Sequence, residues 1–443
     1  MNKVFHLSLL QETRPYVAYA YAYPHKTAYR PIRPRRLREV WREERRDQLF
    51  LYIHIPFCEM RCGFCNLFTT ANPNNNIVDA YLNALARQAA VVRDELGADL
   101  KIARMAIGGG TPSYLLPDQL ARVLDIARRF GVEAGSIPIS VETSPRTASR
   151  DRLSVLSQFG VERISMGVQS FVESEVTASG RAQREDWVER AIGLVRELRF
   201  PVLNLDLIYG LPGQTVESWI VSIEAALRHE PDELYLYPLY VRPLTGLERR
   251  GAEPSDSLRL ACYRAGRNLL IAAGYKQISM RMFRKIRSSH KTYQTHYCCQ
   301  DDGMIGLGCG ARSYTRDLHY SCEYAVGSTG VQEIIRDYID RSDESFSLVD
   351  YGCELDTHEQ RRRWLIKSLF HSSGLDVNRY IGLFGAHPAD QFSEVQQMID
   401  AAYLIERDDF IQPTASGLEW SDALAPMLFS DAVEVRSSEY QFH

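Results

Sequence analysis

The stretch Leu49-Phe-Leu-Tyr-Ile-His-Ile-Pro-Phe-Cys58-Glu-Met-Arg-Cys62-Gly-Phe-Cys65 decides the fold of this chain. Its first seven residues are mostly aromatic or branched and stop at a proline, which is typical of a buried strand that runs into a loop. Three cysteines follow directly. In α/β folds and barrels, ligands bind beyond the carboxyl ends of the strands, so we expect a bound group at this loop.

Three closely spaced thiolates can hold a metal cluster and still leave one metal position without a protein ligand. A structural zinc site uses four protein ligands in a closed tetrahedron, whereas a four-iron cluster held by Cys58, Cys62 and Cys65 exposes one iron to an outside ligand. The alternative is a zinc knuckle completed by a distant histidine or cysteine. The spacing favours iron and sulfur, because it resembles the signature of the radical S-adenosylmethionine (SAM) enzymes.

Strand-like and helix-like segments alternate after this first strand. Apolar runs rich in β-branched and aromatic residues predict strands at 49–56, 101–109, 137–143, 161–168, 202–209 and 233–240. Apolar positions at three- and four-residue spacing predict helices at 78–97, 117–130, 150–159, 185–199 and 215–229. Right-handed crossovers between parallel strands curl a sheet, so we expect an α/β fold built on a partial (β/α)6 TIM-like barrel.

The rest of the chain predicts three further units around the barrel, which itself spans 48–250. Tyrosines and prolines up to residue 34, followed by the basic run from Arg30 to Arg46, predict an N-terminal arm and a basic helix over 1–47. Residues 251–350 would extend the barrel. Over 351–443, helices at 357–371, 376–382 and 390–401 precede a short hairpin, which predicts a small C-terminal α+β domain of winged-helix type.

The arm has two interpretations. It either packs on the barrel exterior with a solvated helix, or it folds over an open active site. In the second case its arginines would bind an anionic substrate. The candidate arginines are Arg30, Arg33, Arg35 and Arg36.

Composition excludes several classes of function. The chain has 443 residues, 45% hydrophobic and 24% charged, and its net charge of −4 gives no attraction to nucleic acid or to acidic membranes. No stretch resembles a signal peptide or a membrane span, so we expect a cytoplasmic protein. Nine cysteines without an export signal indicate reduced thiols. Besides the motif, only the adjacent Cys298 and Cys299 suggest a second metal site.

Small and polar residues recur where the predicted strands end. Gly108-Gly-Gly-Thr111 follows the second strand, and glycines let a backbone approach a ligand closely. Glu142 ends the third strand inside an apolar run, where an unpaired charge is costly. It needs an ammonium group, ribose hydroxyls or a neighbouring arginine. Gln169 and Asp206 repeat this pattern on the next two strands, which indicates one shared site.

These residues together resemble the oxygen-independent coproporphyrinogen III oxidase (HemN-like) branch of the radical SAM superfamily, over about 48–325. The resemblance implies a [4Fe-4S] cluster on the three cysteines and two bound SAM molecules. For the first SAM it implies catalytic roles for Tyr52 and Glu142 and contacts from Tyr52, Phe64, Gly109, Gly110, Thr111 and Glu142. For the second SAM it implies contacts from Gln169, Arg181 and Asp206. It also implies a contact from Tyr240, which stands where the oxidases have a small residue.

The chain departs from that family at three places. The tip Tyr23-Pro-His-Lys-Thr-Ala-Tyr-Arg30 differs from the substrate-binding tip of the porphyrinogen enzymes, and Tyr240 would reshape the pocket of the second SAM. The haem-binding relatives carry a His-Asn-x-x-Tyr-Trp motif, whereas the corresponding stretch here reads Gln294-Thr-His-Tyr-Cys-Cys. These differences bear on the substrate.

Three functions follow from the resemblance. The first is oxidative decarboxylation of propionates by a 5′-deoxyadenosyl radical, with a tetrapyrrole or another anionic metabolite as substrate and a flavodoxin- or ferredoxin-type electron donor. The second is a HemN-like methyltransferase or cyclopropanase that uses two SAM molecules on a specialised metabolite. The third is a haem-trafficking protein, which the absence of the haem motif disfavours.

Overall fold

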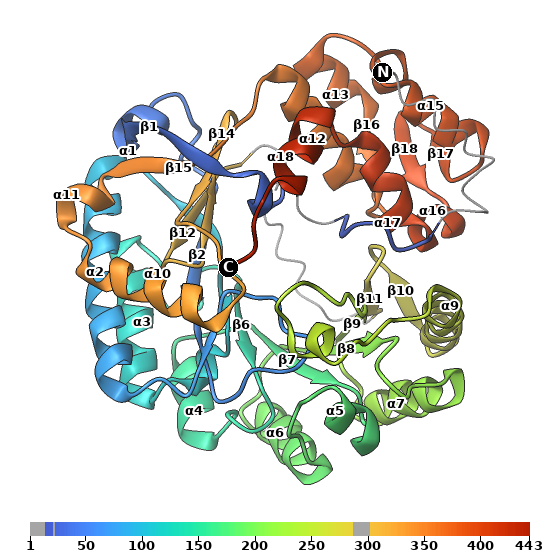
Figure 1. Cartoon of the computed structure of the whole chain (residues 1–443), viewed down its shortest axis with the longest axis horizontal. Helices are drawn as coiled ribbons and strands as arrows, with labels where there is room; N and C mark the ends of the chain where they lie inside the picture. Colours follow the sequence, from blue (N-terminus) through green and yellow to red (C-terminus); the bar gives the residue numbers. More distant parts are fainter. Residues whose placement is uncertain (1–13, 21–22, 287–301) are drawn as a thin grey trace.

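The computed structural model of this protein describes residues 14–20, 23–286 and 302–443. Its centre is a run of six parallel strands in consecutive order within one large sheet (Figure 1). The strands are β2 (Leu49–Ile55), β5 (Ile102–Gly109), β6 (Ile139–Thr143), β7 (Arg163–Gln169), β8 (Val202–Tyr209) and β9 (Glu233–Pro238). The six strands predicted from the apolar runs are therefore confirmed, each within about two residues at either end.

Helices connect these strands and lie along the outside of the sheet (Figure 1). They are α2 (Asn75–Leu96), α3 (Pro117–Arg129), α4 (Arg150–Gln158), α5 (Glu173–Ala178), α6 (Glu185–Glu197) and α7 (Val216–Arg228), with α9 (Asp256–Ala272) packed on α7. Polar caps set the starts of α2 and α7: Asn74 accepts a hydrogen bond from the Ile77 amide, and Thr215 accepts one from the Ser218 amide.

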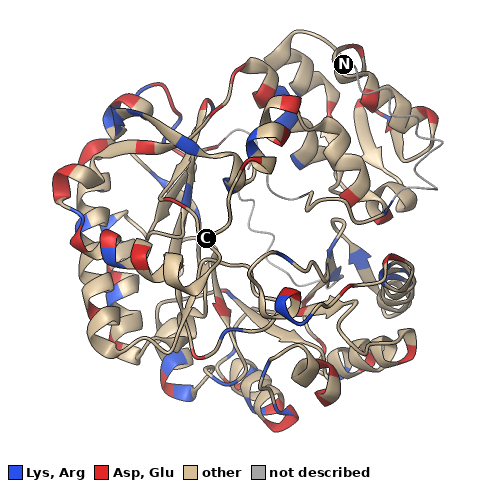
Figure 2. Ribbon diagram, viewed as in Figure 1, with Lys and Arg blue, Asp and Glu red and all other residues tan. Residues whose placement is uncertain are grey.

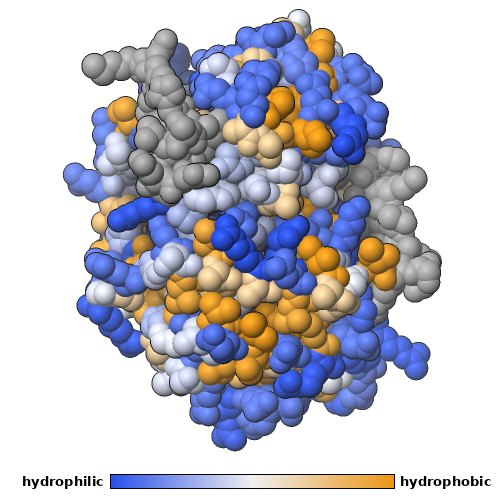
Figure 3. All heavy atoms as spheres, turned by 90° about the vertical axis from the view of Figure 1, so that its right-hand side faces the viewer, coloured by the Kyte–Doolittle hydropathy of each residue, from blue (hydrophilic) through white to orange (hydrophobic). Residues whose placement is uncertain are grey.

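The outward faces of α7 and α9 keep some apolar surface. Val221 and Ile271 are exposed, and Figure 3 shows apolar residues gathered over the lower half of the face on which these helices lie. Elsewhere both signs of charge alternate along the outer helices (Figure 2).

Short strands extend the parallel core at both edges. Beyond β9 lie β11 (Met282–Lys285) and β10 (Tyr275–Gln277), both antiparallel. Beyond β2 lie β12 (Met304–Leu307), which is parallel to β2, and then β13 (Arg312–Tyr314), β14 (Leu318–Ser321), β15 (Leu348–Glu354) and β1 (Arg30–Arg36). The helices α10 (Ser328–Asp340) and α11 (Asp343–Phe346) precede β15.

The predicted basic helix is wrong over most of its length. Residues 30–36 form β1, which pairs antiparallel with β15, and only α1 (Leu37–Val40) is helical. Pro31 and Pro34 explain the difference, because proline lacks the amide hydrogen that a helix needs and is tolerated on an edge strand. β1 is such an edge strand of the sheet.

The C-terminal part builds a second apolar core with a three-stranded sheet. The sheet contains β16 (Leu375–Asp376), β18 (Phe410–Pro413) and β17 (Leu404–Arg407). Around it lie α12 (Thr357–Leu369), α13 (Val377–Phe384), α14 (Pro388–Gln391), α15 (Ser393–Asp400), α16 (Ala415–Glu419), α17 (Ser421–Leu424) and α18 (Asp431–Ser438). Ala20, Tyr23 and Ala28 are buried in this core, so the segment before β1 packs on the C-terminal part.

Within the described residues, no helix is long and apolar enough to cross a membrane.

Candidate functional site

The three motif cysteines lie in a loop, residues 58–65, that leaves the carboxyl end of β2. Cys58 belongs to the two-residue strand β3 (Phe57–Cys58), which pairs with β4 (Thr70–Ala71). Backbone hydrogen bonds hold the middle of this cysteine loop: the Gly63 amide donates to the Ser179 carbonyl at 2.9 Å, and the Gly63 carbonyl accepts from the Leu247 amide at 2.7 Å. A Cβ at Gly63 would lie 2.7 Å from the Ser179 oxygen, so the loop requires glycine here.

All three thiols are partly buried and unbonded to one another. Burial and the neighbouring Cys65 raise the pKa of Cys58 to about 12, and burial followed by Cys62 raises the pKa of Cys65. Donors nevertheless surround the sulfurs: the Thr111 hydroxyl lies 3.5 Å from Cys58 Sγ, and Arg181 Nη1 lies 3.3 Å from Cys62 Sγ. Thiolates in such surroundings need bound cations to stabilise them.

This donor set fits an iron-sulfur cluster. Within the part of the chain that the structure describes, no three His, Cys, Asp or Glu side chains lie close enough to hold a single metal ion. The three thiols are close enough to interact electrostatically. A four-iron cluster suits such thiols, because each sulfur binds a different iron and the three need not meet at one metal ion. Cys58, Cys62 and Cys65 are therefore the residues that would hold it. The predicted pair Cys298 and Cys299 lies outside the described residues.

The glycine run at the end of β5 allows three close approaches. A Cβ at Gly108 would lie 2.8 Å from the Glu142 carboxyl group, and one at Gly109, where φ is +114°, would lie 2.5 Å from the His54 ring. One at Gly110 would lie 3.0 Å from Cys58 Sγ. The predicted residues Gly109, Gly110 and Thr111 therefore lie beside the cysteine loop.

Two carboxylates lie on β6 and β8, the two strands on either side of β7. Glu142 accepts a hydrogen bond from the Gly109 amide at 3.0 Å and has no ion pair with a described residue. Burial raises its pKa to about 7, and the like charge of Asp206 adds to the shift. Asp206 accepts hydrogen bonds from Asn204 Nδ2 at 2.7 Å and Ser165 Oγ at 3.2 Å, and burial raises its pKa.

Gln169 comes from β7, between the strands of the two carboxylates, and Arg181 from the connection between α5 and α6. Gln169 ends β7 at φ +71°, directly after an irregularity in the pairing with β8. Arg181 donates to the Gly167 carbonyl at 2.6 Å while its other nitrogen contacts Cys62 Sγ. The structure therefore brings Arg181 to the cysteines. Gln169 lies two residues after Gly167, whose carbonyl accepts the hydrogen bond from Arg181.

The predicted aromatic residues divide between the site and its rim. Tyr52 lies beside His54, with Oη 3.4 Å from Nδ1, and Phe64 packs on a small apolar cluster that includes Ile208 and Leu247. Tyr240 instead donates to the Asp422 carboxylate at 2.7 Å. Asp422 also forms a buried ion pair with Arg281 at 2.6 Å, so Tyr240 joins the core strands to the C-terminal part.

Sequence reasoning missed His54. Its ring touches Gly109 on one side and Gly310 on the other, and Nε2 lies 3.0 Å from the Phe68 carbonyl oxygen. Burial lowers the pKa of His54 to about 3. A histidine near the end of a buried strand, four residues before the first cysteine, was the available signal.

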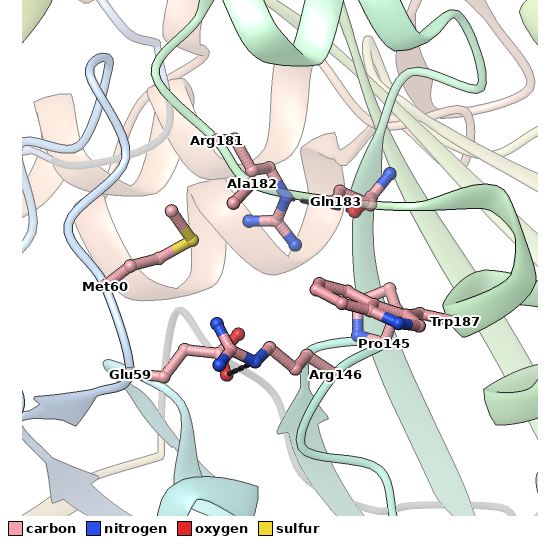
Figure 4. A pocket seen from close by; sticks show the side chains of 8 residues that line it. All are labelled: Glu59, Met60, Pro145, Arg146, Arg181, Ala182, Gln183 and Trp187. Atoms are coloured by element: carbon pink, nitrogen blue, oxygen red, sulfur yellow. Dashed lines mark hydrogen bonds and ion pairs between the residues drawn. The ribbon is translucent and has the colours of Figure 1, made fainter.

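Glu59 and Met60 of the cysteine loop line a small pocket (Figure 4). Arg181, which contacts Cys62, also lines this pocket, and Glu59 and Arg146 point toward each other across it at 3.3 Å. The guanidinium of Arg146 lies 5.3 Å from the Trp187 ring. A single side chain thus links a surface pocket to the thiols.

The arginines of the arm do not reach the site. Arg36 pairs with Glu344 at 2.5 Å, Arg35 with Glu354 at 4.0 Å, and Arg30 with Glu439 at 3.9 Å. Arg33 is exposed on the edge strand β1. The expectation that they bind an anionic substrate has no support in this arrangement.

This fold, with its three-cysteine loop, defines a radical SAM protein, and residues 52–226 match the model of the Radical SAM superfamily. The chain belongs to the HemN-like oxygen-independent coproporphyrinogen III oxidase family of that superfamily. Membership implies a [4Fe-4S] cluster and SAM.

Three relatives show how far this likeness extends. The chain is 30% identical to the oxygen-independent coproporphyrinogen III oxidase of Escherichia coli over 387 residues, covering 83% of this chain and 82% of the relative. It is 30% identical to the heme chaperone HemW of Bacillus subtilis over 347 residues, covering 75% and 86%. The solved structure of coproporphyrinogen III oxidase (HemN) from Escherichia coli superposes with a TM-score of 0.76 at 25% identity, covering 96% and 98%.

Proposed function

We propose that this protein is an oxygen-independent coproporphyrinogen III oxidase-like radical SAM enzyme that oxidatively decarboxylates propionate side chains. The observation that supports this most is the extent of the likeness, since the fold follows HemN over 96% of this chain and 98% of that one. A hydrogen atom leaves the carbon next to the ring, carbon dioxide leaves, one electron passes to an acceptor, and a vinyl group remains.

The cofactor chemistry follows from the cysteine loop. When bound, the reduced cluster and SAM supply a 5′-deoxyadenosyl radical that takes a hydrogen atom from the substrate. Cys58, Cys62 and Cys65 would hold three irons, and Thr111 and Arg181 place donors against two of the sulfurs. These donors favour thiolates in a partly buried loop.

The first SAM would lie over the glycine run. Glu142 has no cationic partner among the described residues, so its carboxylate is available to an ammonium group or to ribose hydroxyls. Tyr52, Phe64, Gly109, Gly110 and Thr111 lie around the same loop and would complete the contacts. Tyr52 and Glu142 would act by orienting SAM for cleavage.

A second SAM would lie against Gln169, Arg181 and Asp206. Arg181 and Asp206 supply one cationic and one anionic side chain, which suits the carboxylate and the ammonium of a second methionine group. Tyr240 would border it, although its hydroxyl already bonds Asp422.

The proposal also includes the division of the chain into domains and its location in the cell. The core strands would form a partial (β/α)6 barrel over 48–250, extended by 251–350 and covered by the arm (1–47) and a winged-helix-like domain (351–443). The protein would act in the cytoplasm. Electrons would come from a flavodoxin- or ferredoxin-type donor.

A haem-chaperone role is the second candidate. It is favoured by the 30% identity to HemW of Bacillus subtilis over 86% of that protein. Under this alternative the protein would bind haem and release it intact rather than transform a porphyrinogen.

The test is anaerobic reconstitution, reduction, and incubation with SAM in the presence and absence of coproporphyrinogen III. Formation of 5′-deoxyadenosine together with carbon dioxide and vinyl products supports the oxidase. S-adenosylhomocysteine formed alongside deoxyadenosine selects methyl or methylene transfer, and haem binding without SAM cleavage selects the chaperone. Cys62→Ala should abolish SAM cleavage, whereas Cys353→Ala, in β15, is the matched control.

A further inference from the structure

Residues 439–443 form a tail that leaves α18 and lies against the start of α10 (Figure 1). The amides of Val326 and Gly327 both donate to the His443 carbonyl oxygen, at 2.9 Å and 2.8 Å. The fit is close, because a Cβ at Gly330, in the first turn of α10, would lie 2.9 Å from His443 Cδ2. Specific contacts therefore hold the tail on the fold.

Tyr440 joins the tail to a second tyrosine. Its hydroxyl donates to the Tyr324 carbonyl, and the centres of the two rings lie 6.0 Å apart. Tyr324 is buried, whereas Tyr440 is half-buried and also meets the Phe442 ring edge to face at 5.1 Å. Tyr440 thus ties the tail to a residue inside the molecule.

The bridging segment, residues 324–327, also bonds the cysteine loop and the residue directly after it. The Tyr324 hydroxyl donates at 3.0 Å to the carbonyl of Asn66, which follows the third motif cysteine. The Arg61 guanidinium donates to the Val326 carbonyl, and Arg61 directly precedes the second motif cysteine. The bridging segment therefore links the tail to the part of the loop that carries the second and third thiols.

The N-terminal segment packs on the same tyrosine. Lys26 Nζ lies 5.6 Å from the centre of the Tyr324 ring, and the His25 ring meets it edge to face at 6.1 Å. The Lys26 side chain is buried, and Nζ donates to the Gly310 carbonyl at 2.6 Å. Tyr324 is thus packed against the N-terminal segment, the tail and the end of the cysteine loop, which leaves its side chain little freedom to move.

We propose that Tyr440 and Arg61 are positioning residues for the iron-sulfur cluster. Tyr440 keeps Tyr324 in place, and Tyr324 and Arg61 keep the cysteine loop in the arrangement in which its thiols meet the cluster. Contacts beyond the ligands orient the ligands, and the loss of one commonly lowers metal affinity by about 10- to 100-fold. This role needs only the cluster that membership of the family implies, and it is independent of the substrate.

Tyr440→Phe tests this role, because it removes the hydroxyl bond to Tyr324 and keeps the ring. In the reconstituted protein, we expect iron to pass to a chelator about tenfold faster than in the wild type under anaerobic conditions. In the cluster-free protein, iodoacetamide should alkylate the three motif cysteines faster, which mass spectrometry of the labelled peptides would measure. Tyr275→Phe is the matched control: its hydroxyl donates to the Pro231 carbonyl from the edge strand β10, and its loss should leave both rates unchanged.

Arg61→Met is an independent test from the loop side, and Arg61→Lys, which keeps a cationic donor, should recover part of the loss. The melting temperature separates positioning from general damage, because a merely structural role would lower it in Tyr440→Phe and Tyr275→Phe alike without changing iron release. The role is refuted if folded Tyr440→Phe and Arg61→Met release iron and react with iodoacetamide at wild-type rates. A wild type that retains iron but leaves coproporphyrinogen III unchanged refutes the proposed function alone.

Discussion

Gly63→Ala tests whether the cysteine loop depends on its tight backbone contact. The new methyl group would lie 2.7 Å from the Ser179 carbonyl oxygen and 3.5 Å from a Leu247 methyl group. The Ser179 carbonyl is backbone and cannot rotate away as a side chain can, so the loop must shift by about 0.7 Å to restore an ordinary contact of 3.4 Å. That shift breaks or stretches the hydrogen bonds to Ser179 and Leu247.

We expect a destabilisation of about 1–3 kcal/mol, as for other overpacked sites, together with a loss of iron per chain. The assays are iron and sulfide content after anaerobic reconstitution and the melting temperature. Gly193→Ala in α6 is the control, because nothing lies within 4 Å of its added Cβ. It should stabilise the protein by about 0.5–1 kcal/mol. Full iron content and an unchanged melting temperature in Gly63→Ala would refute the steric argument.

The remaining predictions concern charges. SAM affinity, measured by equilibrium dialysis, should rise as the pH increases through about 7, where Glu142 ionises. The free energy of unfolding should fall between pH 4.5 and about 7, because the folded protein keeps a proton on Glu142 that the unfolded chain loses. Glu142→Gln should remove both trends. Asp422→Ala should cost about 3–5 kcal/mol in chemical denaturation by leaving Arg281 buried and unpaired, and Arg281→Met added to it should recover part of that loss. Arg181→Met should lower the cluster reduction potential in a redox titration followed by electron paramagnetic resonance, since it removes a positive charge 3.3 Å from Cys62 Sγ.

Matched controls separate these effects from general damage. Arg184→Met removes an exposed arginine near the same pocket and should leave the reduction potential unchanged. An equal shift in both arginine variants would show that the contact with Cys62 has no special effect. A flat pH dependence of SAM affinity in the wild type would exclude Glu142 as the ionising group.

Local pattern was enough to predict the parallel core. Runs such as 202–209 are short and mostly apolar and recur between helical segments, which favours buried parallel strands. The cysteine spacing indicates an iron-sulfur cluster. Glu142 and Asp206 could be predicted because a charge in an apolar run must have a use or a partner.

Features that depend on distant pairing could not be predicted in the same way. The basic run became β1 because β15, more than 300 residues later, provides its partner. The arm arginines were expected to face a substrate, but their partners Glu344, Glu354 and Glu439 are also remote in sequence. Lys26 gave no signal at all, since only the folded chain shows that it is buried.

Because β1 pairs with β15, this edge of the sheet cannot form until residues 348–354 have been synthesised. Residues 30–36 leave the ribosome long before 348–354, and at about 5–20 residues per second the delay is roughly 15–60 s. During that time the parallel strands and the cysteine loop exist while the segment that carries Lys26 has no partner. We expect cluster insertion to be easiest in this interval, and nascent chains stalled before residue 348 to take up iron faster than the finished protein.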